Sequence, residues 1–87
     1  MFVVVLHDIK DANAFFGSAE TVVEGSPKGV KAVQFFPSND KDKAVCLWEA
    51  PSVQVVKNYL EGKIGSASRN TYYAVDSKIA MGLPVLA

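Results

Sequence analysis

The chain has 87 residues, 49% of them apolar, and its nine lysines and arginines balance nine aspartates and glutamates. This length suits one domain with a modest core, and a neutral chain without a basic stripe is not expected to bind nucleic acid. No stretch reaches the roughly 18 apolar residues that span a membrane, and the run that starts at Phe2 is too short for a signal peptide. Cys46 is the only cysteine, which excludes an intrachain disulfide and suits a reducing compartment. We therefore expect a cytoplasmic protein with no membrane partner.

The first half of the chain predicts a strand, a helix and a second strand. Residues 2–6 (FVVVL) form an unbroken apolar run, which is typical of a central strand. Asp11 can cap a helix that ends at Gly25, because apolar residues recur at helical spacing between these two positions. Residues 30–36 predict the second strand, in which two polar residues interrupt the apolar pattern.

The second half predicts a turn, a third strand, a second helix and a last strand. Residues 37–43 are rich in Pro, Ser, Asn, Asp and Lys and indicate a hairpin turn. Residues 44–49 follow as a strand, and Pro51 opens a helix whose apolar positions keep a period near 3.6 as far as Ile64. Residues 71–76, which are aromatic and β-branched, predict the last strand.

This order of elements, β-α-β-β-α-β, predicts a ferredoxin-like α+β sandwich over residues 1–78. The right-handed crossover rule places both helices on one face of a four-stranded, antiparallel-type sheet with strand order 4-1-3-2. We expect the first and third strands to be parallel neighbours. The tail, residues 79–87, is apolar and uncharged, and we expect it to dock on its own sheet or on a partner's. A disordered tail is the alternative.

Alternation along the predicted strands assigns a second apolar face, directed away from the helices. This face carries Phe36, Cys46, Trp48 and Tyr72. A lone subunit that exposed these side chains together would aggregate, so we expect a second copy of the chain to cover them. The predicted partner is therefore the chain itself, as a homodimer.

Polar residues are expected to gather at one end of the sheet. If the first and third strands are parallel, His7 and Glu49 lie side by side, and the fourth strand brings Asn70 and Tyr73 to the same edge. In a catalytic interpretation His7 accepts a proton, Glu49 orients it and Tyr73 donates to a substrate oxygen. The predicted ligand pocket between sheet and helices is bounded by Phe15, Phe16, Val33, Phe35, Leu47 and Tyr59, together with Tyr73. A purely structural hydrogen bond between His7 and Glu49 is the alternative.

Other functions are weighed against this interpretation. A metal site would recruit Cys46 and Asp76 alongside His7 and Glu49, but the strand phase places Cys46 opposite His7, so neither a metal nor a cofactor is expected. The third strand lacks the glycine and the spaced aromatic residues of an RNA-recognition motif. A non-catalytic interaction module, in which the apolar face and tail bind another chain, stays open.

The chain resembles the dimeric α+β barrel superfamily, which includes small antibiotic-biosynthesis-type monooxygenases, muconolactone-isomerase-like proteins and stress-associated proteins. The resemblance rests on the order of elements and on the stretch LWEAPSVQVVKNYLE, in which Trp48 and Glu49 match an aromatic-Glu pair that closes the third strand. Tyr59 stands where the monooxygenase pattern has a helical histidine. The resemblance implies a homodimer with back-to-back sheets and, in each subunit, a pocket for a small, largely apolar molecule. A cofactor-independent monooxygenase- or isomerase-like enzyme is the activity it suggests, and a metal-binding or stress-responsive protein is the alternative.

Overall fold

The structure is a computed structural model that describes residues 1–84. It contains four strands and two helices in the predicted order, namely β1 (Phe2–Ile9), α1 (Ala12–Glu24), β2 (Lys31–Pro37), β3 (Lys43–Glu49), α2 (Val53–Ile64) and β4 (Ser68–Ala74). The first strand continues beyond its apolar run through His7 and Asp8, and the last strand begins three residues before its predicted start.

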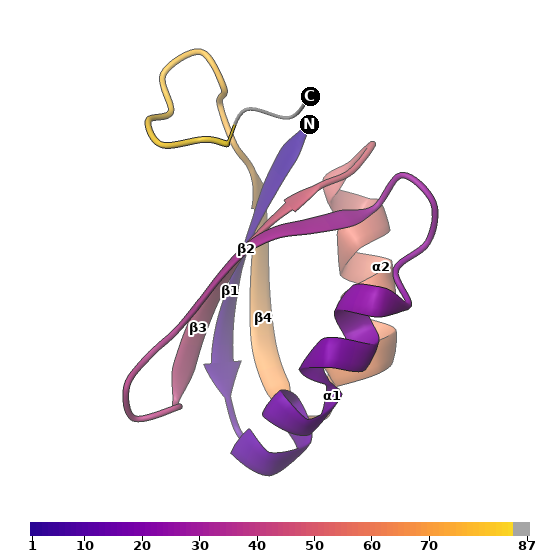
Figure 1. Cartoon of the computed structure of the whole chain (residues 1–87), viewed down its shortest axis with the longest axis vertical. Helices are drawn as coiled ribbons and strands as arrows, with labels where there is room; N and C mark the ends of the chain where they lie inside the picture. Colours follow the sequence, from indigo (N-terminus) through magenta and orange to yellow (C-terminus); the bar gives the residue numbers. More distant parts are fainter. Residues whose placement is uncertain (85–87) are drawn as a thin grey trace.

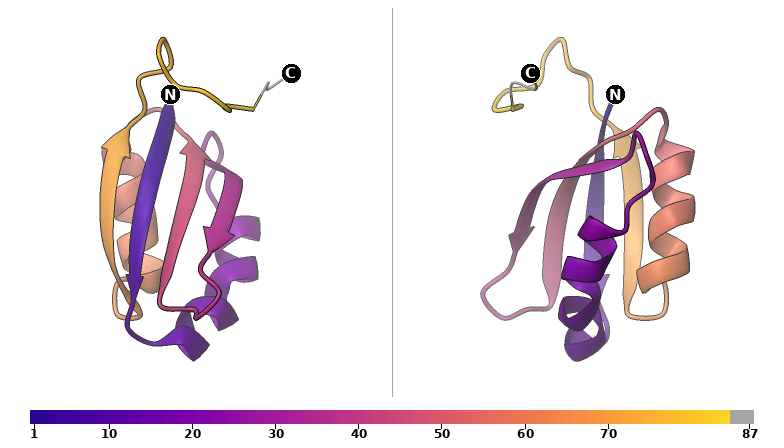
Figure 2. Two further views of the ribbon diagram at one scale, coloured as in Figure 1. Left: turned by 90° about the vertical axis from the view of Figure 1, so that its left-hand side faces the viewer. Right: turned by 45° about the vertical axis from the view of Figure 1, so that its right-hand side comes forward.

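The four strands form one antiparallel sheet in the order β2-β3-β1-β4, and both helices cover the same face of it (Figures 1 and 2). This is the ferredoxin-like arrangement, so the predicted fold class and strand order are confirmed. No helix within residues 1–84 is long and apolar enough to cross a membrane.

The expectation that β1 and β3 run parallel is wrong. The two strands pair antiparallel, with Phe2 opposite Glu49 and His7 opposite Ala44. The physical reason is the connection between them: the α1 crossover leaves β2 parallel to β1, and the hairpin after β2 then reverses the chain into β3. Glu49 therefore lies at the opposite end of the sheet from His7.

The predicted assignment of β3 and β4 side chains to the two faces is also wrong. Cys46, Trp48 and Tyr72 pair with Val5 or Val3 of β1, whose side chains are fully buried beneath the helices, so all three lie on the helix-covered face. The sequence of β3 does not show which residues face the helices, because the side chains on both of its faces are mostly apolar. Trp48 is 2% exposed within a single chain and needs no second copy to cover it.

A β-bulge explains why the second strand does not follow simple alternation. The register of β2 against β3 shifts between Ala32 and Gln34, which leaves Val33 as the extra residue. Ala32 pairs with Trp48 on the helix-covered face, and beyond the bulge Phe35 pairs with Cys46 on the same face. Phe35 therefore faces the helices, as predicted.

The centre of the core lies between β1 and α2. Its largest fully buried side chains are Val3, Val5, Val56 and Leu60. Helix α1 begins at its predicted cap, where Asp11 accepts from the backbone N–H of Ala14 at 3.0 Å. Helix α2 begins after Pro51, as predicted, and there Ser52 accepts from the backbone N–H of Val55 at 3.2 Å. These caps and the apolar stripes hold both helices against the sheet.

The other sheet face, which we call the open face, carries exposed apolar side chains. Leu6, Phe36 and Tyr73 are 45%, 60% and 50% exposed. Leu47 is buried on this face, beside a hollow that residues 79–83 also line. The chain beyond β4 leaves the sheet at the end where the N-terminus lies (Figure 1), and Ile79 and Met81 are largely exposed. Docking of the 79–87 tail stays a prediction, and its residues 85–87 lie outside the described part of the chain.

Candidate functional site

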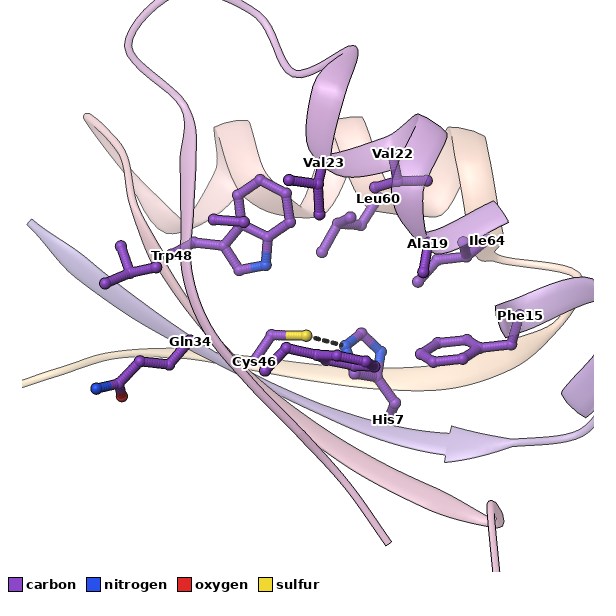
Figure 3. A pocket seen from close by; sticks show the side chains of 13 residues that line it. His7, Phe15, Ala19, Val22, Val23, Gln34, Cys46, Trp48, Leu60 and Ile64 are labelled. Carbon is purple, nitrogen blue, oxygen red and sulfur yellow. Dashed lines mark hydrogen bonds between the residues drawn. The ribbon is translucent and has the colours of Figure 1, made fainter. Parts of the chain in front are cut away.

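A pocket of about 260 Å³ lies between α1 and the β2-β3 side of the sheet (Figure 3). Helix α1 packs against α2 and stands away from the outer strands, which leaves this space open. The pocket is lined by His7, Phe15, Ala19, Val22, Val23, Ala32, Val33, Gln34, Phe35, Cys46, Trp48, Leu60 and Ile64. None of these residues carries a formal charge apart from a protonated His7, so the lining suits an uncharged, largely apolar molecule.

Three strands place the polar side chains at one wall of the pocket. His7 of β1 lies opposite Asn70 of β4, and Cys46 of β3 lies next to it on the same face. The His7 Nδ1 atom is 2.6 Å from Asn70 Oδ1, and His7 Nε2 is 3.0 Å from Cys46 Sγ. The Phe15 ring packs edge-on against the imidazole at 5.0 Å. The histidine is thereby held from three sides.

The hydrogen bonds around Asn70 determine the proton positions. Asn70 Nδ2 donates to the Glu61 carboxylate at 2.8 Å, which turns Asn70 Oδ1 toward His7. Because that oxygen can only accept, His7 Nδ1 carries the proton and Nε2 presents its lone pair to Cys46. The Cys46 thiol therefore donates to His7. Tyr72 also donates to Glu61, at 2.6 Å, and anchors the carboxylate.

The protonation states follow from burial. Burial lowers the pKa of His7 below its ordinary value, although the hydrogen bond with Asn70 opposes this shift. Burial raises the pKa of Cys46 to about 12, with the nearby Trp48 N–H acting in the opposite direction. Hydrogen bonds from Tyr72 and Asn70 lower the pKa of Glu61. At neutral pH the pair is thus a neutral thiol on a neutral imidazole, backed by a charged carboxylate at the surface.

The indole of Trp48 brings an unused donor to the pocket. Its Nε1 atom is buried and makes no well-formed hydrogen bond within residues 1–84, although its N–H lies close enough to the Cys46 sulfur to oppose the rise of the thiol pKa. Figure 3 shows the indole and the Cys46 sulfur on the same side of the pocket. An unpaired buried donor costs about 1–3 kcal/mol. A ligand that presents an oxygen to this N–H would recover part of that cost.

Three residues predicted for the site lie elsewhere. Glu49 is at the far end of β3, opposite Phe2, and cannot orient His7. Tyr73 pairs with Val4 and is half exposed on the open face, and Leu47 pairs with the same valine on that face. Glu49 was misplaced because β3 runs antiparallel to β1 and not parallel to it. Leu47 and Tyr73 were misplaced because the alternating side chains of β3 and β4 were assigned to the wrong faces of the sheet.

The remaining predicted residues lie at or near the pocket. Phe15, Val33 and Phe35 line it. Phe16 packs beside it, with its ring 5.1 Å from Phe15. Tyr59 has a structural contact instead, because its hydroxyl donates to the Val22 carbonyl at 2.7 Å and ties α2 to α1.

Sequence reasoning missed the roles of Cys46, Trp48 and Glu61. The arrival of Asn70 at the His7 edge was anticipated and is confirmed by their pairing. An antiparallel β1-β3 register would have revealed Cys46, since His7 and Cys46 then share a face. Glu61 gave no signal, because it lies on a helix and reaches the cluster only through tertiary packing.

Searches for related proteins found no match. No protein-family profile fits this chain, and no curated protein or solved structure is significantly similar to it. Within residues 1–84, no group of three or more His, Cys, Asp or Glu side chains is placed to hold a metal ion. The function must therefore be argued from the pocket itself.

Proposed function

We propose that this protein binds a small, uncharged, largely apolar molecule that carries one hydrogen-bond-accepting oxygen. The observation that carries this proposal is the Trp48 N–H, which has no hydrogen-bond partner in the described part of the chain and lies at a pocket whose lining is otherwise mostly apolar. A cavity of roughly 150 Å³ holds benzene, so the 260 Å³ pocket has room for a somewhat larger ligand, at the small end of ordinary ligand sites.

The proposal includes a homodimer. The support is the open face, on which the apolar side chains of Leu6, Phe36 and Tyr73 are about half exposed. The resemblance to the dimeric α+β barrel superfamily also favours sheets that pack back to back, with the pocket on the far side of each sheet. Of the four residues first expected at the dimer contact, Cys46, Trp48 and Tyr72 face the helices, so the proposed interface keeps only Phe36.

The monooxygenase activity suggested by the resemblance is not part of the proposal. Tyr59, which replaces the helical histidine of that pattern, is engaged by the Val22 carbonyl. Isomerase-like proton transfer would need a free base, and His7 Nε2 is occupied by the Cys46 thiol. A metal-binding function has no support from the ligand geometry, because Glu49 lies far from His7.

Binding can be tested with 2-octanone and the matched hydrocarbon octane, by calorimetry on the purified protein. The ketone should bind more tightly than octane by about twofold to thirteenfold, because a net hydrogen bond contributes roughly 0.5–1.5 kcal/mol. Trp48→Phe removes the donor and should remove this preference while octane binding persists. Equal affinities for ketone and hydrocarbon in the wild type, or no binding of either, would refute the proposal.

A further inference from the structure

Cys46, His7 and Asn70 form a continuous hydrogen-bonded line from the pocket toward the surface. The thiol donates to His7 Nε2, and His7 Nδ1–H donates to Asn70 Oδ1. Ser68 and Glu61 hold the Asn70 side chain, at 2.7 and 2.8 Å. A nucleophile, a base and a group that fixes the tautomer of the base are thus in sequence.

Packing alone does not explain the position of the Cys46 thiol, which ends this hydrogen-bonded line at the pocket. A buried cysteine with no partner behaves as a small apolar side chain. Here the sulfur lies 3.0 Å from the nitrogen lone pair of a fixed imidazole, at the wall of a cavity. Trp48 adds an independent observation, because its indole is 2% exposed and its N–H lacks a partner within the described residues.

We propose that Cys46 is the nucleophile of an acyl-transfer reaction on a small apolar ester, with His7 as its base and the Trp48 N–H as donor to the oxyanion. This proposal rests on the pocket-binding function argued above and assigns its substrate class. Asn70 is a positioning residue, since it acts on the substrate only through His7.

The reaction balances without an oxidant or a metal. Because burial keeps the Cys46 thiol neutral before the reaction, its proton passes to His7 Nε2 as the sulfur attacks the ester carbonyl carbon, and the negative charge that develops on the carbonyl oxygen is met by the Trp48 N–H. The carbon–oxygen bond to the alcohol then breaks as His7 returns the proton to the leaving oxygen, which leaves a thioester on Cys46. Water attacks the thioester, His7 accepts the water proton, and the carbon–sulfur bond breaks. His7 then reprotonates the sulfur, so that ester and water give an acid and an alcohol.

The lack of charged side chains among the described residues that line the pocket, apart from a protonated His7, favours hydrolysis of the ester over the reverse reaction. The substrate is neutral, as is the pocket lining, whereas the acid product ionises at neutral pH. No lysine or arginine of residues 1–84 lines the pocket to hold an anion. The carboxylate product is therefore expelled to water in preference to the ester.

The test uses 4-nitrophenyl butyrate, with nitrophenol release followed by absorbance and the protein followed by intact mass spectrometry. Wild-type protein should release nitrophenol and gain one butyryl group, which neutral hydroxylamine should remove as a thioester. Cys46→Ala should show only the buffer rate. His7→Gln should lose about 10²–10⁴-fold in rate, as expected for a missing base, and Trp48→Phe about 10²–10³-fold, as expected for a missing oxyanion donor.

Asn70→Ala separates positioning from structural support. The rate should require neutral His7, so it should fall on the acid side of the His7 pKa. The groups that face this imidazole are Cys46 from β3, Asn70 from β4 and Phe15 from α1, and the charge that acts on it is that of Glu61 on α2. Tyr72 reaches the cluster through its hydrogen bond to Glu61. Because the Asn70 hydrogen bond raises the His7 pKa, its loss should lower kcat and move the acid limb of the pH profile to lower pH. An unchanged profile would overturn the role of Asn70.

Two outcomes distinguish this proposal from the binding function. If wild-type protein binds 2-octanone but forms no butyryl thioester, acyl transfer is overturned and binding stands. If it binds neither 2-octanone nor octane, the pocket function itself is overturned. Retention of thermal unfolding midpoint and circular dichroism in Cys46→Ala shows that lost turnover is not lost fold.

Discussion

Filling the pocket from α1 tests both its existence and its use. Ala19 lines the pocket, and a leucine there would add three carbons to apolar space. At about 0.8 kcal/mol per buried methylene this gives ~2.4 kcal/mol, from which lost leucine side-chain entropy removes about 0.5–1 kcal/mol. We therefore expect Ala19→Leu to stabilise the ligand-free protein by about 1.5 kcal/mol, which raises Tm by roughly 6–12 °C for a domain of this size.

The matched control is Ala14→Leu on the same helix, where the side chain is exposed to solvent. It should change the free energy of unfolding by less than about 0.5 kcal/mol, as surface substitutions usually do. Urea unfolding followed by circular dichroism measures both variants, and calorimetry should show that Ala19→Leu no longer binds 2-octanone. A loss of 1 kcal/mol or more in Ala19→Leu, or unchanged ketone binding, would show that this space is not the ligand site.

Three further predictions address His7, Trp48 and the open face. Because burial lowers the pKa of His7 in the folded protein, the imidazole of the unfolded chain takes up a proton first as the pH falls. The contribution of neutral His7 to the free energy of unfolding should therefore be fully present above about pH 6.5 and decline below it. The loss should be about 1.4 kcal/mol for each unit by which the folded and unfolded pKa values of His7 differ. Urea unfolding between pH 7 and 5 should show this slope in wild type and a shallower one in His7→Gln, and equal slopes would contradict the assignment. Trp48→Phe should change the free energy of unfolding by only about 1 kcal/mol, because relief of the unpaired N–H offsets lost packing; a loss above roughly 3 kcal/mol would mean that the N–H is paired. If the proposed homodimer forms through the open face, Phe36→Glu should convert it to a monomer in sedimentation experiments, whereas Val55→Glu at an exposed position of α2 should not. Wild-type protein that sediments as a monomer would refute the proposed dimer.

Local sequence signals were sufficient for the order of the elements and for the N-terminal ends of the helices, but not for every strand boundary. Asp11 and Ser52 cap their helices, and the apolar stripe of each helix faces the core. These features depend on neighbours within a few residues. The order of elements and the crossover rule then restrict the topology, which is why the fold class could be predicted.

The candidate site depended on which strands pair and in which direction. His7 and Glu49 were expected to meet, but an antiparallel β1-β3 pair separates them and brings His7 beside Cys46 instead. The bulge at Val33 shifted the outer strand further. A one-residue change of phase moves every side chain to the other face, so small errors in register displaced whole sets of predicted residues.

By itself the sequence determined the helices, the strands, their caps and the neutral, mostly apolar character of the chain, because these properties follow from the residue types and from periodicity along the backbone. Only the tertiary structure decided that the Cys46 thiol meets His7, that Asn70 and Glu61 support the imidazole, and that the Trp48 N–H finds no hydrogen-bond partner among residues 1–84. These contacts join residues up to 63 positions apart. Strand register and helix packing set their distances, and both depend on the whole core at once.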